Sequence, residues 1–549
     1  MLVVLLLQAC IPTPTPAAPT LTPVPPTATA IPPTPTPSIE PVSPWWTGAV
    51  FYEAFVRSFY DSNGDGIGDF NGLTAKLDYL NDGNPATKTD LGITALWLMP
   101  IFPSPSYHGY DVTDYYAVNP QYGTMDEFKK MLSEAHRRGI KVIIDLVINH
   151  TSIDHPWFQA AVNGDPKYKD YYIWSDTDPG YGGPDGQQVW YKAGNGKYYY
   201  AVFWSRMPDL NLKNPAVTEE INKIGDFWQK EVGVDGFRVD GAKHLIEEGT
   251  KQVDTDSTHA WLKEFFSHYK ANSAEAMSVG EAWTNSFEAV RYVKDNNFDL
   301  VFNFDLARGL MSAISNRDAA KLGNTVPFEA NLFRNGGMAT FLTNHDQNRV
   351  MSQFGKETDK AKLAAAMLLT MPGTPFIYYG EEIGMTGTKS DEMIRTPMQW
   401  DATTRSGFTT GDKAWNAVNS DYDQRNVATQ SANPDSLLSL YRDLIDARLR
   451  HPALRSGSLV KMTTENNRVF AMLRTTDAET VLVVLNLSTE TIKDYSLAAG
   501  EGMPDGTYQP GIIYGKGDLA DLTVSGGKFS GYKPLNELPA GGIFVIKLR

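Results

Sequence analysis

Short apolar runs with β-forming composition recur along the chain from Trp45 onward, and stretches with helical spacing lie between many of them. The helical stretches include Met125–Arg138, Thr218–Glu231 and Thr358–Leu369. Strand-like runs separated by helices predict an α/β fold, a (β/α)₈ TIM barrel of parallel strands. The eight runs are Ala49–Phe55, Ile93–Met99, Val142–Ile148, Asp235–Asp240, Met277–Ala282, Leu300–Phe304, Met338–Thr343 and Phe376–Tyr379.

Two departures from this rhythm predict further domains. The step from the third run to the fourth is roughly twice the usual spacing, so we expect an inserted subdomain over 151–208 after strand three, within a barrel formed by 45–150 and 209–454. A helical pattern over Ser436–Arg450 is the last of its kind. Beyond it, apolar or alternating runs between Gly-rich turns predict a C-terminal all-β domain over 455–549, a β-sandwich: Arg468–Leu473, Thr480–Leu487 and Gly542–Leu548.

The first 44 residues have a different character. Leu2–Leu7 is too short an apolar run to span a bilayer, but with Gln8, Ala9 and Cys10 it resembles a bacterial lipoprotein signal over 1–10 in which Cys10 is lipidated. Residues 11–44 hold 13 of the 34 prolines, which predicts an extended spacer. We therefore expect an exported protein anchored at the cell surface or extracellular. For residues 1–10 the alternative is a buried thiol at Cys10 or a random apolar start. For residues 11–44 it is a disordered tail of no specific use.

Composition narrows the function classes. The 549 residues carry 49 Lys and Arg against 64 Asp and Glu, a net charge of −15, which argues against a nucleic-acid partner. One Cys excludes a disulfide scaffold and a Cys-based zinc cluster. With 42% hydrophobic residues the chain supplies a large core, so global disorder is excluded.

Polar clusters follow four of the predicted strands, where barrel enzymes carry their active sites. Strand alternation places Arg238 and Asp240 on one face, so the guanidinium should keep Asp240 ionised and lower its pKa, which suits a nucleophile. Glu281 precedes an indole, and a dry site favours a protonated general acid. Any one acid alone could be a structural ion-pair partner, but their repetition at successive strand ends indicates an active site. The clusters are Asp145-Leu-Val-Ile-Asn149-His150, Gly236-Phe-Arg238-Val-Asp240-Gly-Ala-Lys243-His244, Gly280-Glu281-Ala-Trp283 and Thr343-Asn-His345-Asp346.

In order, these clusters resemble the signature regions of glycoside hydrolase family 13, the α-amylase family, and the resemblance runs from Trp45 to the C-terminus. It implies Asp240 as nucleophile, Glu281 as general acid/base and Asp346 as third carboxylate. With a nucleophile and a general acid/base it implies a retaining mechanism, which requires the two carboxyl groups to lie about 5–5.5 Å apart. The resemblance also implies substrate-binding roles, with Tyr110 as a stacking platform, for His108, Tyr110, His150, Arg238, Lys243, His244, Trp283, His345, Asp391 and Arg395.

Two groups of oxygen donors suggest Ca²⁺ as a cofactor. Asp61, Asn63, Asp65, Ile67 and Asp69 alternate with turn-forming residues, and hard oxygen donors at this spacing favour Ca²⁺. This segment resembles the calcium loop of the oligo-1,6-glucosidase branch of the family; the alternative is a solvated acidic turn. A second set, formed by Asn149, Asp209 and the His244 carbonyl, resembles the older amylase calcium site.

Different motifs of the sequence resemble different branches of the family. Met207-Pro-Asp209-Leu-Asn211 resembles the group intermediate between oligo-1,6-glucosidases and neopullulanases. Arg395-Thr-Pro-Met-Gln-Trp400 resembles oligo-1,6-glucosidases, whereas Lys243-His244 and Tyr107 resemble α-amylases. Exo-acting relatives usually have Asp at the position of Tyr107, so an open cleft and internal cleavage are implied.

We therefore predict a monomeric, retaining, endo-acting α-1,4-glucan hydrolase that degrades starch and maltooligosaccharides outside the cell. One alternative is an exo-α-glucosidase, oligo-1,6-glucosidase, neopullulanase or transglycosylase that uses the same residues. A remote alternative is a glycan-binding lipoprotein without catalysis, but such relatives typically lack one of the three carboxylates present here.

Overall fold

The computed structural model describes residues 44–549. The predicted signal with Cys10, and the predicted spacer up to residue 43, lie outside the described residues. Within residues 44–549, no helix combines the length and the apolar character needed to cross a membrane.

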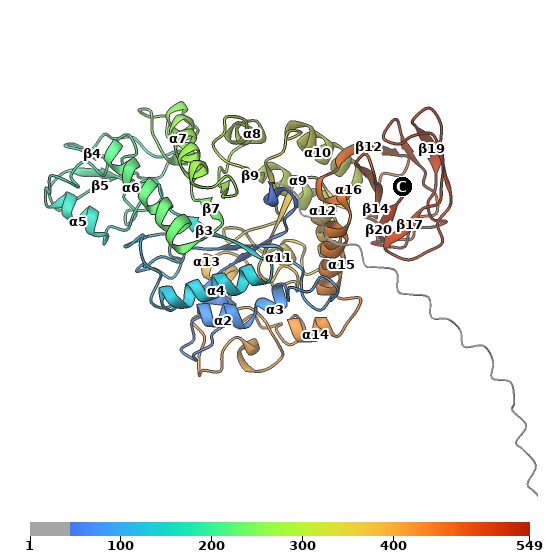
Figure 1. The fold of residues 1–549 in the computed structure, drawn as a ribbon, viewed down its shortest axis with the longest axis horizontal. Coiled ribbons are helices and arrows are strands. Elements are labelled where there is room, and N and C mark those ends of the chain that lie inside the picture. The colour runs from blue at the N-terminus through green and yellow to red at the C-terminus, as the bar shows by residue number, and fades with distance from the viewer. Residues whose placement is uncertain (1–43) are drawn as a thin grey trace, which may run out of the picture. The chain divides into compact units, whose positions relative to one another are not determined.

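Eight parallel strands close into a barrel (Figure 1) in the order β1-β11-β10-β9-β8-β7-β3-β2. The predicted TIM barrel is confirmed, and each predicted run overlaps one of these strands, with ends displaced by a few residues. Strands β3, β7 and β8 are in register, with Leu146 beside Val239 and Val239 beside Gly280. The polar residues that follow these strands therefore emerge on one face. The strands are β1 Phe51–Ala54, β2 Ala95–Leu98, β3 Lys141–Leu146, β7 Gly236–Val239, β8 Met277–Gly280, β9 Leu300–Phe302, β10 Met338–Thr340 and β11 Thr374–Tyr378.

Helices surround the barrel. Helix α4 begins at a capping box between Thr124 and Glu127, which satisfies the first orphan N–H groups. The predicted helix Thr218–Glu231 differs in detail: α6 begins after the Asn214 cap, and the chain continues in a π-helical segment, Phe227–Val232. The longer helices are α4 Met125–Arg137, α6 Pro215–Asp226, α7 Asp256–Asn272, α8 Ser286–Lys294, α9 Phe304–Ser315, α10 Ala319–Leu332, α12 Thr358–Thr370 and α15 Leu437–Arg450. The shorter helices are α1 Val56–Phe59, α2 Phe70–Ala75, α3 Leu77–Leu80, α5 Pro156–Val162, α11 Val350–Gln353, α13 Asp391–Ile394, α14 Val427–Ser431 and α16 Pro452–Ser456.

The long connection between β3 and β7 forms an inserted subdomain, as the sequence predicts. It contains α5 and a three-stranded antiparallel sheet in the order β4-β6-β5. A bridge between His150 and Asp209 joins the start and the end of the insert. Buried apolar residues such as Trp190 and Tyr200 form a small core of its own. The strands are β4 Trp174–Ser175, β5 Trp190–Lys192 and β6 Tyr198–Tyr200.

The C-terminal part is all-β, as predicted, with a seven-stranded sheet in the order β17-β20-β14-β13-β12-β15-β19 and a two-stranded ribbon β16-β18. In β13, Phe470 and Met472 pack into the barrel core, while Ala471 and Leu473 pack into a separate C-terminal core. Alternate residues of one strand thus bury both faces of the sheet. The strands are β12 Ser458–Thr464, β13 Val469–Thr475, β14 Thr480–Asn486, β15 Leu497–Ala499, β16 Gly506–Tyr508, β17 Gly511–Tyr514, β18 Leu522–Val524, β19 Phe529–Tyr532 and β20 Ile543–Lys547.

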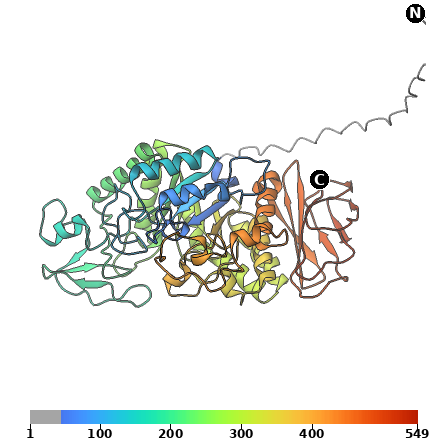
Figure 2. The same ribbon diagram turned by 90° about the horizontal axis from the view of Figure 1, so that it is seen from below.

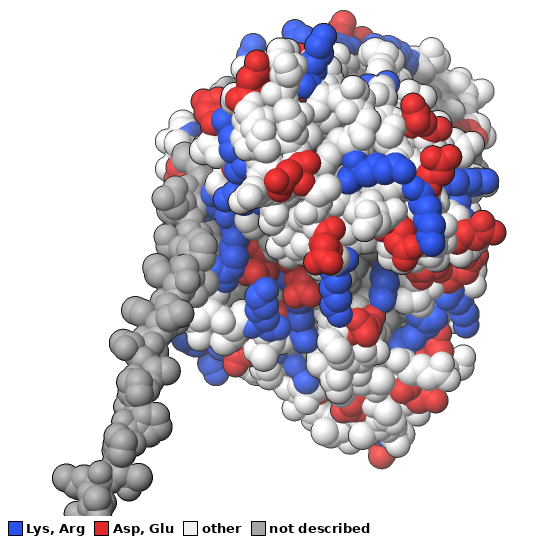
Figure 3. Space-filling view, turned by 90° about the vertical axis from the view of Figure 1, so that its right-hand side faces the viewer, with Lys and Arg blue, Asp and Glu red and all other residues white. Residues whose placement is uncertain are grey.

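The insert and the C-terminal sheet lie on opposite sides of the barrel in both ribbon views (Figure 1 and Figure 2). On the face that shows the C-terminal sheet, Lys and Arg side chains lie interspersed with Asp and Glu (Figure 3). On this face the two signs of charge are therefore mixed rather than separated into a basic and an acidic patch.

Candidate active site

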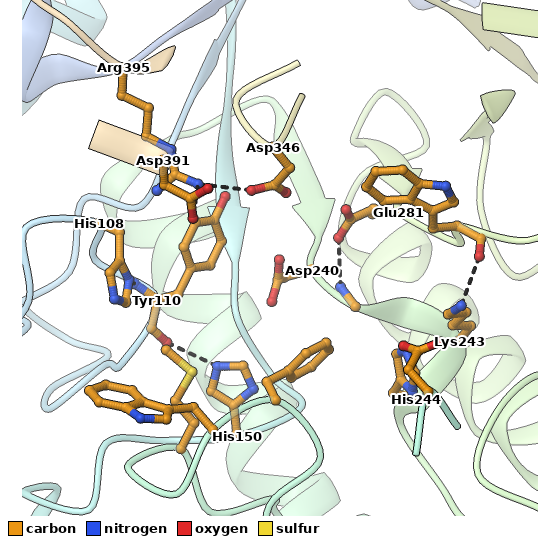
Figure 4. A pocket seen from close by; sticks show the side chains of 16 residues that line it. His108, Tyr110, His150, Asp240, Lys243, His244, Glu281, Asp346, Asp391 and Arg395 are labelled. Carbon is orange, nitrogen blue, oxygen red and sulfur yellow. Dashed lines mark hydrogen bonds and ion pairs between the residues drawn. The ribbon is translucent and has the colours of Figure 1, made fainter. Parts of the chain in front are cut away.

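A cavity of about 700 Å³ opens at the carboxyl ends of the barrel strands (Figure 4). The structure brings almost all of the predicted catalytic and substrate-binding residues together in its lining. Arg238 and His345 are fully buried and contact the acids of this lining. The predicted residues that line the cavity are His108, Tyr110, His150, Asp240, Lys243, His244, Glu281, Trp283, Asp346, Asp391 and Arg395.

One buried guanidinium connects three carboxylates. Arg238 Nη1 lies 2.7 Å from Asp145 Oδ1 and 2.6 Å from Asp240 Oδ1, and its Nη2 lies 2.7 Å from Glu281 Oε2. The alternation of β7 places Arg238 and Asp240 on one side, as the sequence predicts. Burial raises the pKa of Asp145 to about 7, against the lowering effect of Arg238. The shared cation offsets part of the cost of burying these acids and holds Asp240 and Glu281 together.

Glu281 has the electrostatic properties of a proton donor. Burial, with the charges of Asp240 and Asp346, raises its pKa to about 7 against the lowering effect of Arg238. The Gly241 N–H donates to Glu281 Oε2 at 3.1 Å, which fixes the carboxyl group. A carboxyl group with this pKa is partly protonated at neutral pH, as general acid catalysis requires.

Asp346 has a lowered pKa, in contrast to Glu281. Burial acts to raise its pKa, but the nearby His345, Arg395 and Arg238 outweigh burial and lower it. Arg395 Nη2 lies 2.8 Å from Asp346 Oδ1 and 3.4 Å from Asp391 Oδ2. Asp346 therefore stays ionised, and Arg395 joins it to Asp391 on the same wall.

Tyr110 also lines the cavity and lies beside this group (Figure 4). Its hydroxyl group lies 2.6 Å from His345 Nε2 and donates to Asp145 Oδ2 at 3.2 Å. Its ring stacks against His345 with a centroid separation of 5.6 Å, and its carbonyl group contacts His150 Nε2 at 3.1 Å. These contacts hold the Tyr110 side chain in one orientation at the cavity.

Several residues of this site were not predicted as such from the sequence. The insert contributes Phe203, Trp204, Met207 and Asp185 to the cavity lining. Phe203 lies edge-on to His150 at 5.4 Å and to His244 at 5.1 Å. The aromatic richness of the insert was a signal for such contacts, although it did not distinguish these positions.

Two buried acids beneath the site were also missed as site residues. Glu53 accepts a hydrogen bond from His345 Nδ1 and orients that imidazole. Asp145 binds both Arg238 and Tyr110. A carboxylate inside an otherwise apolar strand, as in the Ala49–Phe55 run, is the signal that could have identified Glu53.

The predicted calcium loop consists of consecutive hydrogen-bonded turns. Asp61 Oδ1 accepts from the N–H groups of Asn63 and Gly64, and Asp65 Oδ1 accepts from Ile67 N. Asp61 and Asp69 are buried, and the ion pairs found within residues 44–549 include neither of them. Within residues 44–549, no group of three or more His, Cys, Asp or Glu side chains is placed to hold a metal ion. A cation at this loop therefore also needs the Asn63 side chain and carbonyl oxygens such as that of Ile67. This all-oxygen donor set fits Ca²⁺.

At the second predicted calcium site, a hydrogen bond joins two of the three predicted residues, Asn149 and Asp209. Asn149 Nδ2 donates to Asp209 Oδ2 at 3.0 Å, and the buried Asn149 Oδ1 has no hydrogen-bond partner. Burial and the charge of Glu247 raise the pKa of Asp209. An orphaned amide oxygen beside a buried carboxylate fits a hard cation, whereas His244 enters none of the hydrogen bonds described for this pair.

Residues 53–457 match the family model described as the α-amylase catalytic domain. The chain belongs to the α-amylase family, glycoside hydrolase family 13. It is therefore a glycoside hydrolase, and the predicted resemblance is confirmed.

The similar proteins carry different enzyme names, α-amylase and oligo-1,6-glucosidase among them. The hydrolase is 43% identical to α-amylase 3 of Dictyoglomus thermophilum, over 81% of this chain and 86% of that one. It is 33% identical to oligo-1,6-glucosidase of Parageobacillus thermoglucosidasius, over 81% and 91%. The crystal structure of the α-amylase from H. orenii superposes with a TM-score of 0.80 at 39% identity, over 92% of this chain and all of that one. These names are consistent with the predicted intermediate group.

Proposed function

We propose that this glucan hydrolase is a retaining, endo-acting α-1,4-glucan hydrolase. The observation that carries the proposal is the placement of Asp240 and Glu281 on one buried guanidinium at an open cavity. Exposed aromatic side chains border that cavity: Phe203 is 45% exposed, Trp204 43% and Trp283 36%. Such surfaces fit several sugar rings rather than a single terminal glucose.

The chemistry proceeds in two steps. Glu281 protonates the glycosidic oxygen while Asp240 attacks the anomeric carbon from the opposite face, which forms a glycosyl ester. Water, deprotonated by Glu281, then hydrolyses the ester, so the anomeric configuration is retained. Asp346, held ionised by His345 and Arg395, binds sugar hydroxyl groups more tightly in the distorted transition state.

Maltoheptaose blocked at its non-reducing end tests internal cleavage. An endo-acting enzyme cleaves the blocked chain at a rate close to that of the free chain, because no subsite requires a free end. Release of products only after unblocking would contradict the proposal. It would favour the exo-acting alternative, which the similarity to an oligo-1,6-glucosidase supports. Activity on an isomaltooligosaccharide separates that alternative further.

We also propose Ca²⁺ as a structural cofactor held by the loop of Asp61, Asn63, Asp65, Ile67 and Asp69. A ligand bound only by the folded state stabilises it by about 2.7 kcal/mol at a hundred times its Kd. Chelation is therefore expected to lower Tm by a few degrees, and added Ca²⁺ to restore it, as calorimetry can measure.

A matched pair of variants assigns the calcium effect to this loop. Asp65→Ala should abolish most of the Tm response. Asp178→Ala should leave that response intact, since Asp178 is also an exposed carboxylate that accepts a hydrogen bond from the N–H group two residues on. An equal response in both variants, or a Tm indifferent to chelation, would remove Ca²⁺ from this loop.

We further propose an extracellular site of action with attachment through a lipid on Cys10. A starch polymer cannot cross a membrane, and acyl chains anchor a protein through buried CH₂ groups worth about 0.8 kcal/mol each. Wild type is expected to fractionate with membranes, whereas Cys10→Ser is released or unprocessed. Equal partition of both proteins into the soluble fraction would contradict the anchor.

A further inference from the structure

Two phenylalanines outside the cavity lining are unusually exposed. Phe287 on α8 is 63% exposed and Phe328 on α10 is 49% exposed, and their ring centroids lie 5.9 Å apart at an interplanar angle of 72°. Among the residues described, the large exposed apolar side chains are few, and three of the others line the cavity: Phe203, Trp204 and Trp283. Exposed apolar groups that gather near an active site mark a binding surface more often than scattered ones.

Three buried polar side chains, which we call the polar joint, connect the two helices that carry the rings. Ser286 Oγ donates to Glu329 Oε1 at 3.0 Å, and Asn303 Nδ2 donates to Glu329 Oε2 at 2.8 Å. All three polar residues are buried. Because Ser286 precedes Phe287 and Glu329 follows Phe328, this joint fixes the ring pair relative to the barrel. Both rings therefore project from helices that this joint connects to the end of β9, and not from loops.

The same joint connects the ring pair to the cavity. Asn303 is followed by Phe304, and the Phe304 ring stacks under Trp283 with a centroid separation of 4.5 Å and an angle of 11°. Trp283 lines the cavity and precedes Phe287 by four residues, a reach of at most about 14 Å. Helix α8 also begins on the carboxyl side of β8, which is the face that carries the cavity. The rings therefore lie close to the end of the cavity marked by Trp283.

The position of Glu281 indicates which part of the substrate lies at the Trp283 end of the cavity. The general acid protonates the leaving oxygen, so the sugars released with the leaving group lie on the side of Glu281 and Trp283. The amino group of Lys243 donates to the Trp283 carbonyl oxygen at 2.8 Å, which ties the residue after the nucleophile segment to the same rim. A glucan chain that continues past Trp283 reaches the ring pair next.

We propose that Phe287 and Phe328 form an aromatic track, a binding surface for long α-glucan chains that extends the leaving-group side of the cleft. This proposal rests on the proposed function. Pyranose rings present apolar C–H faces that pack on aromatic rings, and a neutral glucan needs no charged partner. Phenylalanine offers contact area without a hydrogen bond, so the track favours chain length over a particular end group. The track is a specificity determinant and takes no part in bond cleavage.

The test compares long and short substrates in Phe287→Ala, Phe328→Ala and the double variant. For the double variant, kcat/KM for amylose is expected to fall about tenfold, while kcat/KM for maltotriose stays within about twofold, since a trisaccharide does not reach the rings. Retardation in gels that contain amylose should weaken in parallel. Phe287→Trp keeps a ring and should retain the preference for amylose. Ile512→Ala, at an exposed apolar position on β17, is the matched control and should behave as wild type.

The outcomes separate this proposal from the proposed function. An unchanged preference for amylose in the double variant, or an equal loss on both substrates, would overturn the track. An equal loss would reveal a structural role, and an unchanged preference would leave the pair as a contact for another macromolecule. Blocked maltoheptaose decides endo action in the wild type independently, and the amylose gels report binding even if cleavage proves to be exo-acting.

Discussion

Asp240→Asn is expected to lower kcat on starch on the order of 10⁴-fold or more, equivalent to at least about 5 kcal/mol of transition-state stabilisation. The carboxamide keeps the shape of the side chain but cannot form the glycosyl ester. Arg238 retains its contacts with Asp145 and Glu281, so the site should remain assembled. Binding of acarbose, measured by calorimetry, should survive. A variant that keeps a tenth of the wild-type rate would show that Asp240 is not the nucleophile.

The stereochemistry of chemical rescue sharpens this assignment. In Asp240→Ala, azide enters from the face that the carboxylate has left, so an α-glucosyl fluoride should yield the β-azide. In Glu281→Ala the nucleophile is intact, and azide attacks the glycosyl ester to yield the α-azide. NMR of the products distinguishes the two anomers. The same anomer from both variants would contradict the separate roles of the two residues.

Glu281→Gln is expected to lower kcat/KM for starch by about 10²–10⁴-fold, the usual contribution of general acid–base catalysis. Formation of the glycosyl ester from an activated aryl glycoside should persist, since a good leaving group departs without a proton. A burst of phenol measured by stopped flow would report this first step. An equal loss of the first step on both substrate types would remove Glu281 from the acid role.

The pH dependence gives a second test of the same group. With a pKa of about 7, Glu281 loses its proton as the pH rises through neutrality, so kcat/KM for starch should fall on the alkaline side. For the activated aryl glycoside this alkaline limb should disappear. Because Asp240 and Asp346 interact with Glu281, the inflection belongs to the coupled carboxylates. A limb of identical position and depth on both substrates would assign it to another group.

The barrel, and the gathering of Asp240, Glu281 and Asp346 at one cavity, could be predicted from local features of the sequence. A parallel strand buried on both faces is a continuous apolar run, and Asp240, Glu281 and Asp346 lie at or just after the ends of such runs. Since all strands of a closed parallel barrel end on one face, the position of each acid after its strand predicted their meeting. The C-terminal strands were harder, because β15 and β19 are short and lie between glycine-rich turns with little periodicity.

Contacts between distant segments were decided only by the tertiary structure. Glu53 and His345 are 292 residues apart, and nothing in the local sequence around either residue predicts their contact. The value of about 7 for the pKa of Glu281 arises chiefly from burial, which the neighbouring indole suggested but could not quantify. The ring pair of Phe287 and Phe328 likewise depends on one buried glutamate between two helices. Periodicity and motif order report the local environment of each strand end, whereas desolvation and partner choice depend on side chains brought together by folding.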